Sequence, residues 1–134
     1  MKVVKKELHI KTMGEIDVID ITGMVEGVVK DSGIKNGLVT VFIPGATGAI
    51  TTIEFEPNLV QDFKDVLEKL VPKTGRYRHP INGHSHLRAS ILGPSLSVPI
   101  ANGNLILGTW QQIVFVELDV RPRSRRLIVQ VVGE

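Results

Sequence analysis

Residues 95–107, with the sequence SLSVPIANGNLIL, predict two β-strands joined by a tight turn. Asn102 and Gly103 form a dipeptide that two-residue hairpin loops favour, because both residues tolerate the positive φ angles of such a turn. Residues 95–100 form the first predicted strand, and residues 104–107 return beside it. A hairpin of this kind is typical of an antiparallel sheet.

Strand patterns also occupy much of the remaining chain. Residues 3–12 and 15–22 alternate between two sets of side chains, which is the period-two pattern of a β-strand. Four further segments are rich in β-branched and apolar residues and predict additional strands: residues 38–43, 49–55, 113–118 and 127–132.

Two segments have helical spacing instead. A short one begins near Thr22 and stops at Gly33, and a longer one runs from Pro57 to about Val71. Strands therefore outnumber helices and include a hairpin, which predicts an α+β fold with a largely antiparallel sheet and two or three helices. We expect a single domain over residues 1–134, because this length is typical of one domain and can bury a real core.

The composition excludes several classes of protein. The chain has 134 residues, of which 43% are hydrophobic and 22% charged, a balance that is ordinary for a folded domain. It has no cysteine, which excludes disulfides, thiolate chemistry and cysteine-based metal sites. No apolar run approaches the ~20 residues that span a bilayer, and residues 1–11 lack the apolar core of a signal peptide. We therefore expect a cytoplasmic protein with no membrane partner.

Three of the four histidines, His79, His84 and His86, lie close together in the sequence. If His84 and His86 lie on a strand, their side chains point to the same face, because side chains alternate along a strand. His79 would then fold back across a short loop as a third ligand, and three protein ligands with one open position are typical of catalytic zinc. Neutral imidazole suits zinc, nickel, iron or copper, and we expect a divalent metal, zinc or magnesium, as the cofactor. The alternative is that one or more of these histidines are polar structural residues.

The distribution of charge points to an anionic ligand. No carboxylate lies between Glu68 and Glu117, whereas residues 69–88 contribute five cations. This asymmetry indicates a site that receives a phosphorylated small molecule, with Arg88 as the phosphate contact. The alternative is that residues 90–116 are mostly buried strand, where carboxylates are disfavoured in any case.

Glu54 and the single tryptophan, Trp110, are further candidates. Glu54 stands in an otherwise apolar segment and is either a metal ligand, general base or histidine partner, or an exposed carboxylate at a strand end. Trp110, with the polar Thr109 and Gln111 beside it, either stacks on a planar heterocycle or packs in the core. The arginines at 121–126 are interpreted as a solvated turn or a weak nucleic-acid patch, and with 4% aromatic residues we do not expect nucleic acid to be the partner.

Six short motifs lie along nearly the whole chain. They are Ile50-Thr51 through Glu54, Tyr77-x-His79, Ser85-His86-Leu87-x-Ala89-Ser90, Leu92-Gly93-x-Ser95-Leu96, Gly108-Thr109-Trp110-Gln111 after Gly103, and Arg125-Arg126 to Gly133-Glu134. Through these motifs the chain resembles the YjbQ-type family, whose members are often called secondary thiamine-phosphate synthase enzymes. The Gly-Thr-Trp-Gln motif, at its distance from Ser-His, is specific to that family.

The resemblance implies a small α+β subunit assembled as a homotrimer, with clefts between the subunits. It also implies a histidine-rich, metal-binding site and a weak transferase activity that joins the pyrimidine pyrophosphate and thiazole phosphate halves of thiamine phosphate. The metal ligands in this chain would be His79, His84 and His86, and the catalytic residues Glu54 and His86. The substrate-binding residues would be Arg88, Ser90, Thr109, Trp110 and Gln111.

One position departs from the family pattern. Most members carry a histidine directly after the proline of a Pro-His-Thr-Thr/Ser-Ala motif, whereas here Gly45 follows Pro44. One candidate ligand or acid–base group is therefore missing. Either the site is rebuilt around His79, His84 and His86, or the chain has lost the chemistry. A non-catalytic module that binds a phosphorylated metabolite or a metal is accordingly the alternative function.

Overall fold

Two antiparallel sheets form the frame of the structure, a computed structural model that describes residues 1–134. The larger sheet has five strands, in the order β1 (Lys2–Lys11), β8 (Ser124–Gly133), β3 (Gly37–Phe42), β5 (Ser95–Ala101) and β6 (Asn104–Leu105). The smaller sheet has three strands, in the order β2 (Asp17–Asp20), β7 (Gln112–Glu117) and β4 (Gly48–Ile53). Every pairing is antiparallel, as predicted.

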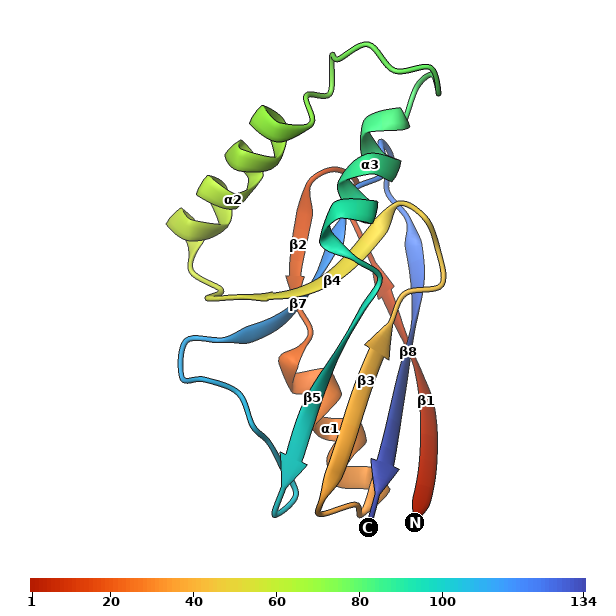
Figure 1. Ribbon diagram of the computed structural model, residues 1–134, viewed down its shortest axis with the longest axis vertical. Coiled ribbons are helices and arrows are strands. Elements are labelled where there is room, and N and C mark those ends of the chain that lie inside the picture. Colours follow the sequence, from red (N-terminus) through yellow and green to blue (C-terminus); the bar gives the residue numbers. More distant parts are fainter.

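Three helices complete the α+β fold, and they are α1 (Thr22–Ser32), α2 (Pro57–Leu70) and α3 (Gly83–Leu92) (Figure 1). α1 ends where the sequence predicts, because Gly33 adopts a left-handed φ of 73°. α2 also begins as predicted, and the Glu56 side chain accepts hydrogen bonds from the first free N–H groups of that helix. None of the three helices combines the length and the apolar character that crossing a bilayer requires.

The predicted hairpin joins β5 to β6. Asn102 and Gly103 have φ angles of 53° and 80°, the two positive values that a type I′ turn needs. Ala101 pairs with Asn104 directly across this turn. The returning strand ends at Leu105, however, and the chain then leaves the sheet and runs as a loop to β7.

The smaller sheet lies in the middle of the molecule, and both of its faces are covered. Ile113 and Phe115 of β7 join the core that the larger sheet and α1 share. Val114 and Val116 point the other way, into a second core that includes residues of α2 and α3. A strand that is covered on both faces needs no polar alternation, which explains its continuous apolar run.

The segment that carries His84 and His86 is helical, so the prediction of a strand there is wrong. Residues two apart on an α-helix are related by a rotation of ~200° about the helix axis, and the two imidazoles therefore lie on different sides of α3. The same geometry separates Arg88 from His86 and places it one turn beyond His84. Because this segment is a helix and not a strand, different predicted site residues lie close together than expected.

Candidate functional site

A cavity of about 200 Å³ lies between α3 and the loop that joins β3 to β4. His86 and Ser90 stand one helical turn apart, so both reach it from the same side of α3. The lining residues are Gly45, Ala46, Gly48, His86, Ala89, Ser90 and Pro94. No carboxylate lines this cavity, and His86 supplies its only titratable side chain.

His79 lies beside this cavity at the end of the loop before α3. Its ring meets the ring of His86 edge to face, with 4.8 Å between the centroids and an angle of 69° between the planes. The Nε2 atom of His79 lies 3.0 Å from Oδ1 of Asn82. His79 itself is exposed and His86 half-buried, so both imidazoles are accessible to a small molecule.

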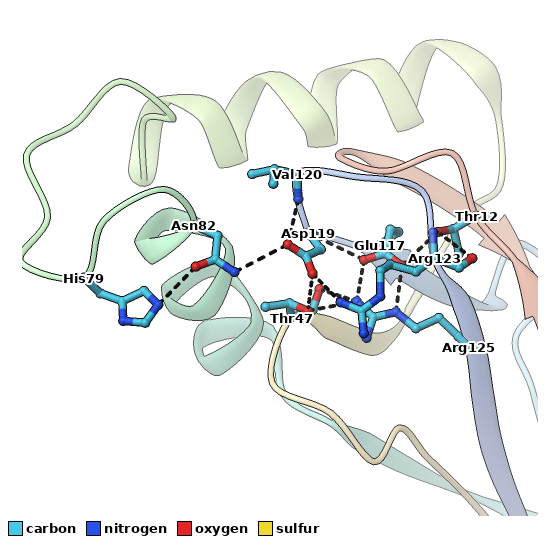
Figure 2. A network of polar contacts seen from close by, with 9 residues as sticks. All are labelled: Thr12, Thr47, His79, Asn82, Glu117, Asp119, Val120, Arg123 and Arg125. Atoms are coloured by element: carbon cyan, nitrogen blue, oxygen red, sulfur yellow. Dashed lines mark hydrogen bonds and ion pairs between the residues drawn. The ribbon is translucent and has the colours of Figure 1, made fainter.

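Asn82 connects this pair of histidines to a buried polar network, which Figure 2 shows. Its Nδ2 donates to Oδ1 of Asp119 at 3.4 Å. Asp119 in turn pairs with Arg123 and accepts a hydrogen bond from the Val120 backbone N–H at 2.8 Å. The network therefore leads from the exposed His79 to the interior of the molecule.

The pKa of Asp119 lies below its ordinary value. Burial raises this pKa, but hydrogen bonds from the Val120 backbone, Asn82 and Arg123, together with the charge of Arg123, lower it by more. Asp119 is therefore a carboxylate at neutral pH and only accepts hydrogen bonds there.

The inner half of the network is an ion pair between Glu117 and Arg125. Nε and Nη2 of Arg125 contact the two carboxylate oxygens of Glu117 at 2.7 and 2.5 Å. Nη2 also donates to the Thr47 hydroxyl at 2.9 Å, and Thr12 donates to Glu117 at 2.9 Å. This pair fixes the loop after β3 against β7 and β8, and that loop forms one wall of the cavity.

His84 is removed from the other two histidines. It is almost fully buried, and its Nε2 lies 2.9 Å from Oε1 of Glu15. No group of three or more histidine, aspartate or glutamate side chains lies close enough together to hold a metal ion. Within one chain, the predicted set of His79, His84 and His86 therefore does not fit a three-ligand metal site.

Arg88 is also buried, so its predicted position beside His86 is wrong. Its Nε donates to the Val71 carbonyl at 3.0 Å, and its Nη2 contacts Glu68 at 2.6 Å. The Lys73 backbone N–H and the Arg88 guanidinium lower the pKa of Glu68, although partial desolvation opposes them. The guanidinium of Arg88 thus ties the end of α2 to α3, and it does not line the cavity.

The remaining predicted residues lie at the far end of β4. Gln111 donates to the Thr52 hydroxyl at 3.2 Å, and Thr109 and Trp110 belong to the exposed loop before β7. Trp110 is 72% exposed, which excludes the alternative of a core tryptophan. Glu54 follows β4 and is half-buried. The six residues of β4 span ~17 Å and separate this group from the cavity at its other end.

The arginines at 121–126 do not form a uniform solvated turn. Arg125 is buried against Glu117, whereas Arg123 pairs with Asp119 and Arg126 with Glu7. Three of these cations are thus already neutralised by carboxylates, which weakens the interpretation as a nucleic-acid patch.

Asn82, Thr47, Asp119 and the Glu117–Arg125 pair are the site residues that sequence reasoning missed. The sequence does indicate that Arg125 is buried. It stands two residues before the apolar Leu127, and side chains two apart on a strand point to the same face. No comparable signal exists for Asn82, because its role depends on a loop that folds back over Asp119.

Gly45 follows Pro44, where the family resemblance leads us to expect a histidine. A Cβ atom at this position would lie 3.4 Å from Nη1 of Arg125, and Gly45 itself lines the cavity. The missing side chain therefore leaves additional space along the wall that the loop after β3 forms.

Comparisons with known proteins agree over nearly the full chain. Residues 6–134 match the family model described as UPF0047 protein YjbQ-like. The UPF0047 protein of Methanothermobacter thermautotrophicus is 46% identical, over 100% of this chain and 95% of the relative. The UPF0047 protein YugU of Bacillus subtilis is 34% identical, over 96% and 98% of the two chains.

Solved structures give the same result. A crystal structure of a YbjQ-like protein of unknown function from Sulfolobus solfataricus has a TM-score of 0.96 and 34% identity, over 99% of both chains. A YjbQ/UPF0047 protein from Clostridium acetobutylicum has a TM-score of 0.90 and 39% identity, over 95% of this chain and 99% of that one. The fold, the motifs and these matches together show that the chain belongs to the YjbQ-like UPF0047 family.

Proposed function

We propose that this protein binds a phosphorylated small molecule in the cavity between α3 and the loop after β3. The observation that carries this proposal is the set of groups around the cavity: two adjacent imidazoles, the Ser90 hydroxyl and a small-residue loop, with no carboxylate in the lining. Imidazole and hydroxyl groups donate hydrogen bonds to phosphate oxygens, and small residues let the backbone approach a ligand closely. A volume of about 200 Å³ accommodates a phosphate or pyrophosphate group with part of its carrier.

The transferase activity that the family resemblance implies is compatible with this site. Joining the two halves of thiamine phosphate forms a carbon–nitrogen bond at the pyrimidine methylene carbon and breaks the bond from that carbon to the pyrophosphate oxygen. The electron pair of the broken bond leaves with pyrophosphate, so the transition state gains negative charge on that oxygen. His86 would donate a hydrogen bond to it, with Ser90 orienting the phosphate. Arg88, which was expected to contact the phosphate, has no part in this proposal because it is buried.

A divalent metal would supply further positive charge for the leaving group. The two adjacent imidazoles of one chain do not complete a ligand set for it. Metal dependence is therefore one of the outcomes that the binding experiment below distinguishes.

A complete site needs a second copy of the chain. Glu54 and residues 109–111 carry family motifs, yet in one chain none of them lines the cavity, because they lie at the opposite end of β4 from Gly48. The outer face of the larger sheet also exposes Leu38 and Phe42, which are 44% and 40% accessible. We therefore propose that the chain forms a homotrimer, in which a neighbouring copy brings its Trp110 loop toward the cavity.

Sedimentation velocity at micromolar concentration is expected to show a particle of three times the chain mass. Replacing both Leu38 and Phe42 with Glu should shift it toward the monomer, because charges would replace apolar groups in the contact. Met24→Glu is the matched control, since Met24 is 45% exposed on α1 and lies away from that sheet face. A monomer for the unmodified chain would contradict the trimer.

Calorimetric titration with pyrophosphate tests the proposed ligand site. We expect binding by the unmodified chain in the presence of EDTA and at least a tenfold loss of affinity in His86→Ala, because His86 lines the cavity directly. His9→Ala is the control, since His9 lies on β1 and does not line this cavity. Equal affinity of the His86→Ala variant and the unmodified chain would rule the site out. Binding that requires added Mg²⁺ would show that the imidazoles alone are insufficient.

A further inference from the structure

Three side chains lie in a row from the exposed ring beside His86 to the interior: His79, Asn82 and Asp119 (Figure 2). His79 Nε2 lies 3.0 Å from Asn82 Oδ1, and Asn82 Nδ2 lies 3.4 Å from Asp119 Oδ1. The hydrogen bonds along this row all run in one direction, because the NH₂ group of a side-chain amide only donates and its carbonyl oxygen only accepts.

Asp119 sets this direction. Its oxygens already accept hydrogen bonds from the Arg123 guanidinium and the Val120 N–H, so the side chain is an ionised acceptor. Asn82 must therefore turn its NH₂ group toward Asp119 and its carbonyl oxygen toward His79. Because the Asn82 carbonyl oxygen can only accept, the hydrogen bond between the two side chains requires a hydrogen on Nε2 of His79.

Asn82 is itself held firmly at the start of α3. Its backbone carbonyl accepts from the N–H groups of Ser85 and His86 at 3.0 and 3.3 Å, and its own N–H donates to the Pro80 carbonyl at 2.8 Å. The amide thus projects from the turn that begins the helix carrying His86. This ties the orientation of the His79 ring to the helix that forms the other side of the site.

We propose that Asn82 is a positioning residue that holds neutral His79 in the Nε2–H tautomer and leaves Nδ1 as the atom that meets the bound molecule. In that tautomer Nδ1 has a free lone pair, which accepts a hydrogen bond or a proton from the ligand. The identity of the ligand rests on the proposed function, whereas the tautomer rests only on the row of contacts from Asp119.

Nitrogen NMR of the full-length protein, labelled with ¹⁵N-histidine, measures the tautomer directly. At a fixed alkaline pH, where the rings are neutral, we expect the His79 Nε2 resonance at its protonated limit and Nδ1 at its unprotonated limit. In Asn82→Ala the two resonances should move toward each other, because the ring then exchanges between tautomers in solvent. His79→Gln assigns the signals, His9 serves as an internal reference, and Asn104→Ala is a control on an exposed hairpin asparagine.

Two results would overturn the proposal: averaged His79 resonances in the unmodified protein, or resonances that Asn82→Ala leaves unchanged. Asp119→Asn gives an independent check, because an amide at position 119 no longer dictates how Asn82 is oriented. It should therefore shift the His79 resonances in the same direction as Asn82→Ala, and an unshifted spectrum would show that Asp119 does not set the direction.

A second measurement assigns the ligand-facing atom. The shorter amide side chain introduced by His79→Asn would place its polar atoms near the position of Nδ1, and the longer one introduced by His79→Gln near that of Nε2. Pyrophosphate affinity should therefore fall less in His79→Asn than in His79→Gln, and the reverse order would contradict the assignment of Nδ1. If no form binds pyrophosphate, the proposed function fails, and the NMR spectra still decide whether Asn82 sets the tautomer.

Discussion

Replacing Arg125 with Met is expected to lower the free energy of unfolding by about 3–5 kcal/mol, because it leaves the carboxylate of Glu117 buried without a counter-charge. Glu117 is 0% exposed, and Arg125 provides two of its closest contacts, at 2.7 and 2.5 Å. Thr12 and the Asp119 backbone N–H continue to donate to Glu117 in the variant. These neutral donors do not replace a guanidinium. Urea unfolding of the variant and the unmodified chain measures the difference.

Two further variants make this result specific to the ion pair. Glu117→Leu combined with Arg125→Met should unfold with a smaller loss than the sum of the single changes, because no charge then remains buried. Arg126→Met should cost about 1 kcal/mol or less, since Arg126 forms an exposed pair with Glu7. A loss below about 1 kcal/mol in Arg125→Met would show that Glu117 takes up a proton or reaches water instead.

Phe115→Ala is expected to lower the free energy of unfolding by about 3–5 kcal/mol as well, because it opens a cavity in a core that cannot easily collapse. Phe115 is 0% exposed on β7, in the core between the two sheets. Its ring lies directly over Gly48, where a Cβ atom would stand 2.6 Å from the ring edge. Phe42→Ala is the matched control, because Phe42 is 40% exposed on the outer sheet face.

The close contact between Phe115 and Gly48 predicts that one substitution has opposite effects in two backgrounds. Gly48→Ala should destabilise the unmodified chain, since the added methyl group would overlap the Phe115 ring. In the Phe115→Ala background the same methyl group fills part of the cavity and should restore stability. Additive effects of the two substitutions in urea unfolding would contradict this packing.

The strands and two of the three helices could be predicted because their side chains follow the period of the element. The first strand alternates at most positions, with Val4, Leu8 and Ile10 on one face, and α2 carries apolar residues at helical spacing after Pro57. The turn at Asn102 and Gly103 could also be predicted from these two residues alone, because both tolerate the positive φ angles that the turn requires. Local chemistry was sufficient in each of these places.

α3 could not be found in the same way, because its buried face is largely polar. His84, Ser85 and Arg88 point inward. His84 pairs with Glu15 and Arg88 with the end of α2, whereas the Ser85 hydroxyl has no hydrogen-bond partner. A hydrophobic period is absent when a helix is held by ion pairs and hydrogen bonds rather than by apolar contacts. The sequence alone therefore favours a strand for the histidine pair, and the three-ligand prediction depends on that incorrect assignment.

The candidate site was predicted only where its residues are close in sequence. His79 and His86 come from one short segment and do meet in the structure. Asp119 joins them from the turn after β7, Arg125 from β8, and Thr47 from the loop after β3. Contacts of this kind depend on the packing of separate elements, which a single sequence without its fold does not display.

The order of strands in the larger sheet has a consequence for biosynthesis. β8 lies between β1 and β3, so Lys2 and Lys11 find their partners only at Gly133 and Ser124. On the ribosome, β1 and β3 emerge long before the strand that joins them, and each leaves an unpaired edge until β8 appears. A sheet closed by such distant segments folds slowly, because the loop must be ordered before any contact compensates for it. Nascent chains stalled ahead of β8 would carry two open edges and would be prone to pair with one another.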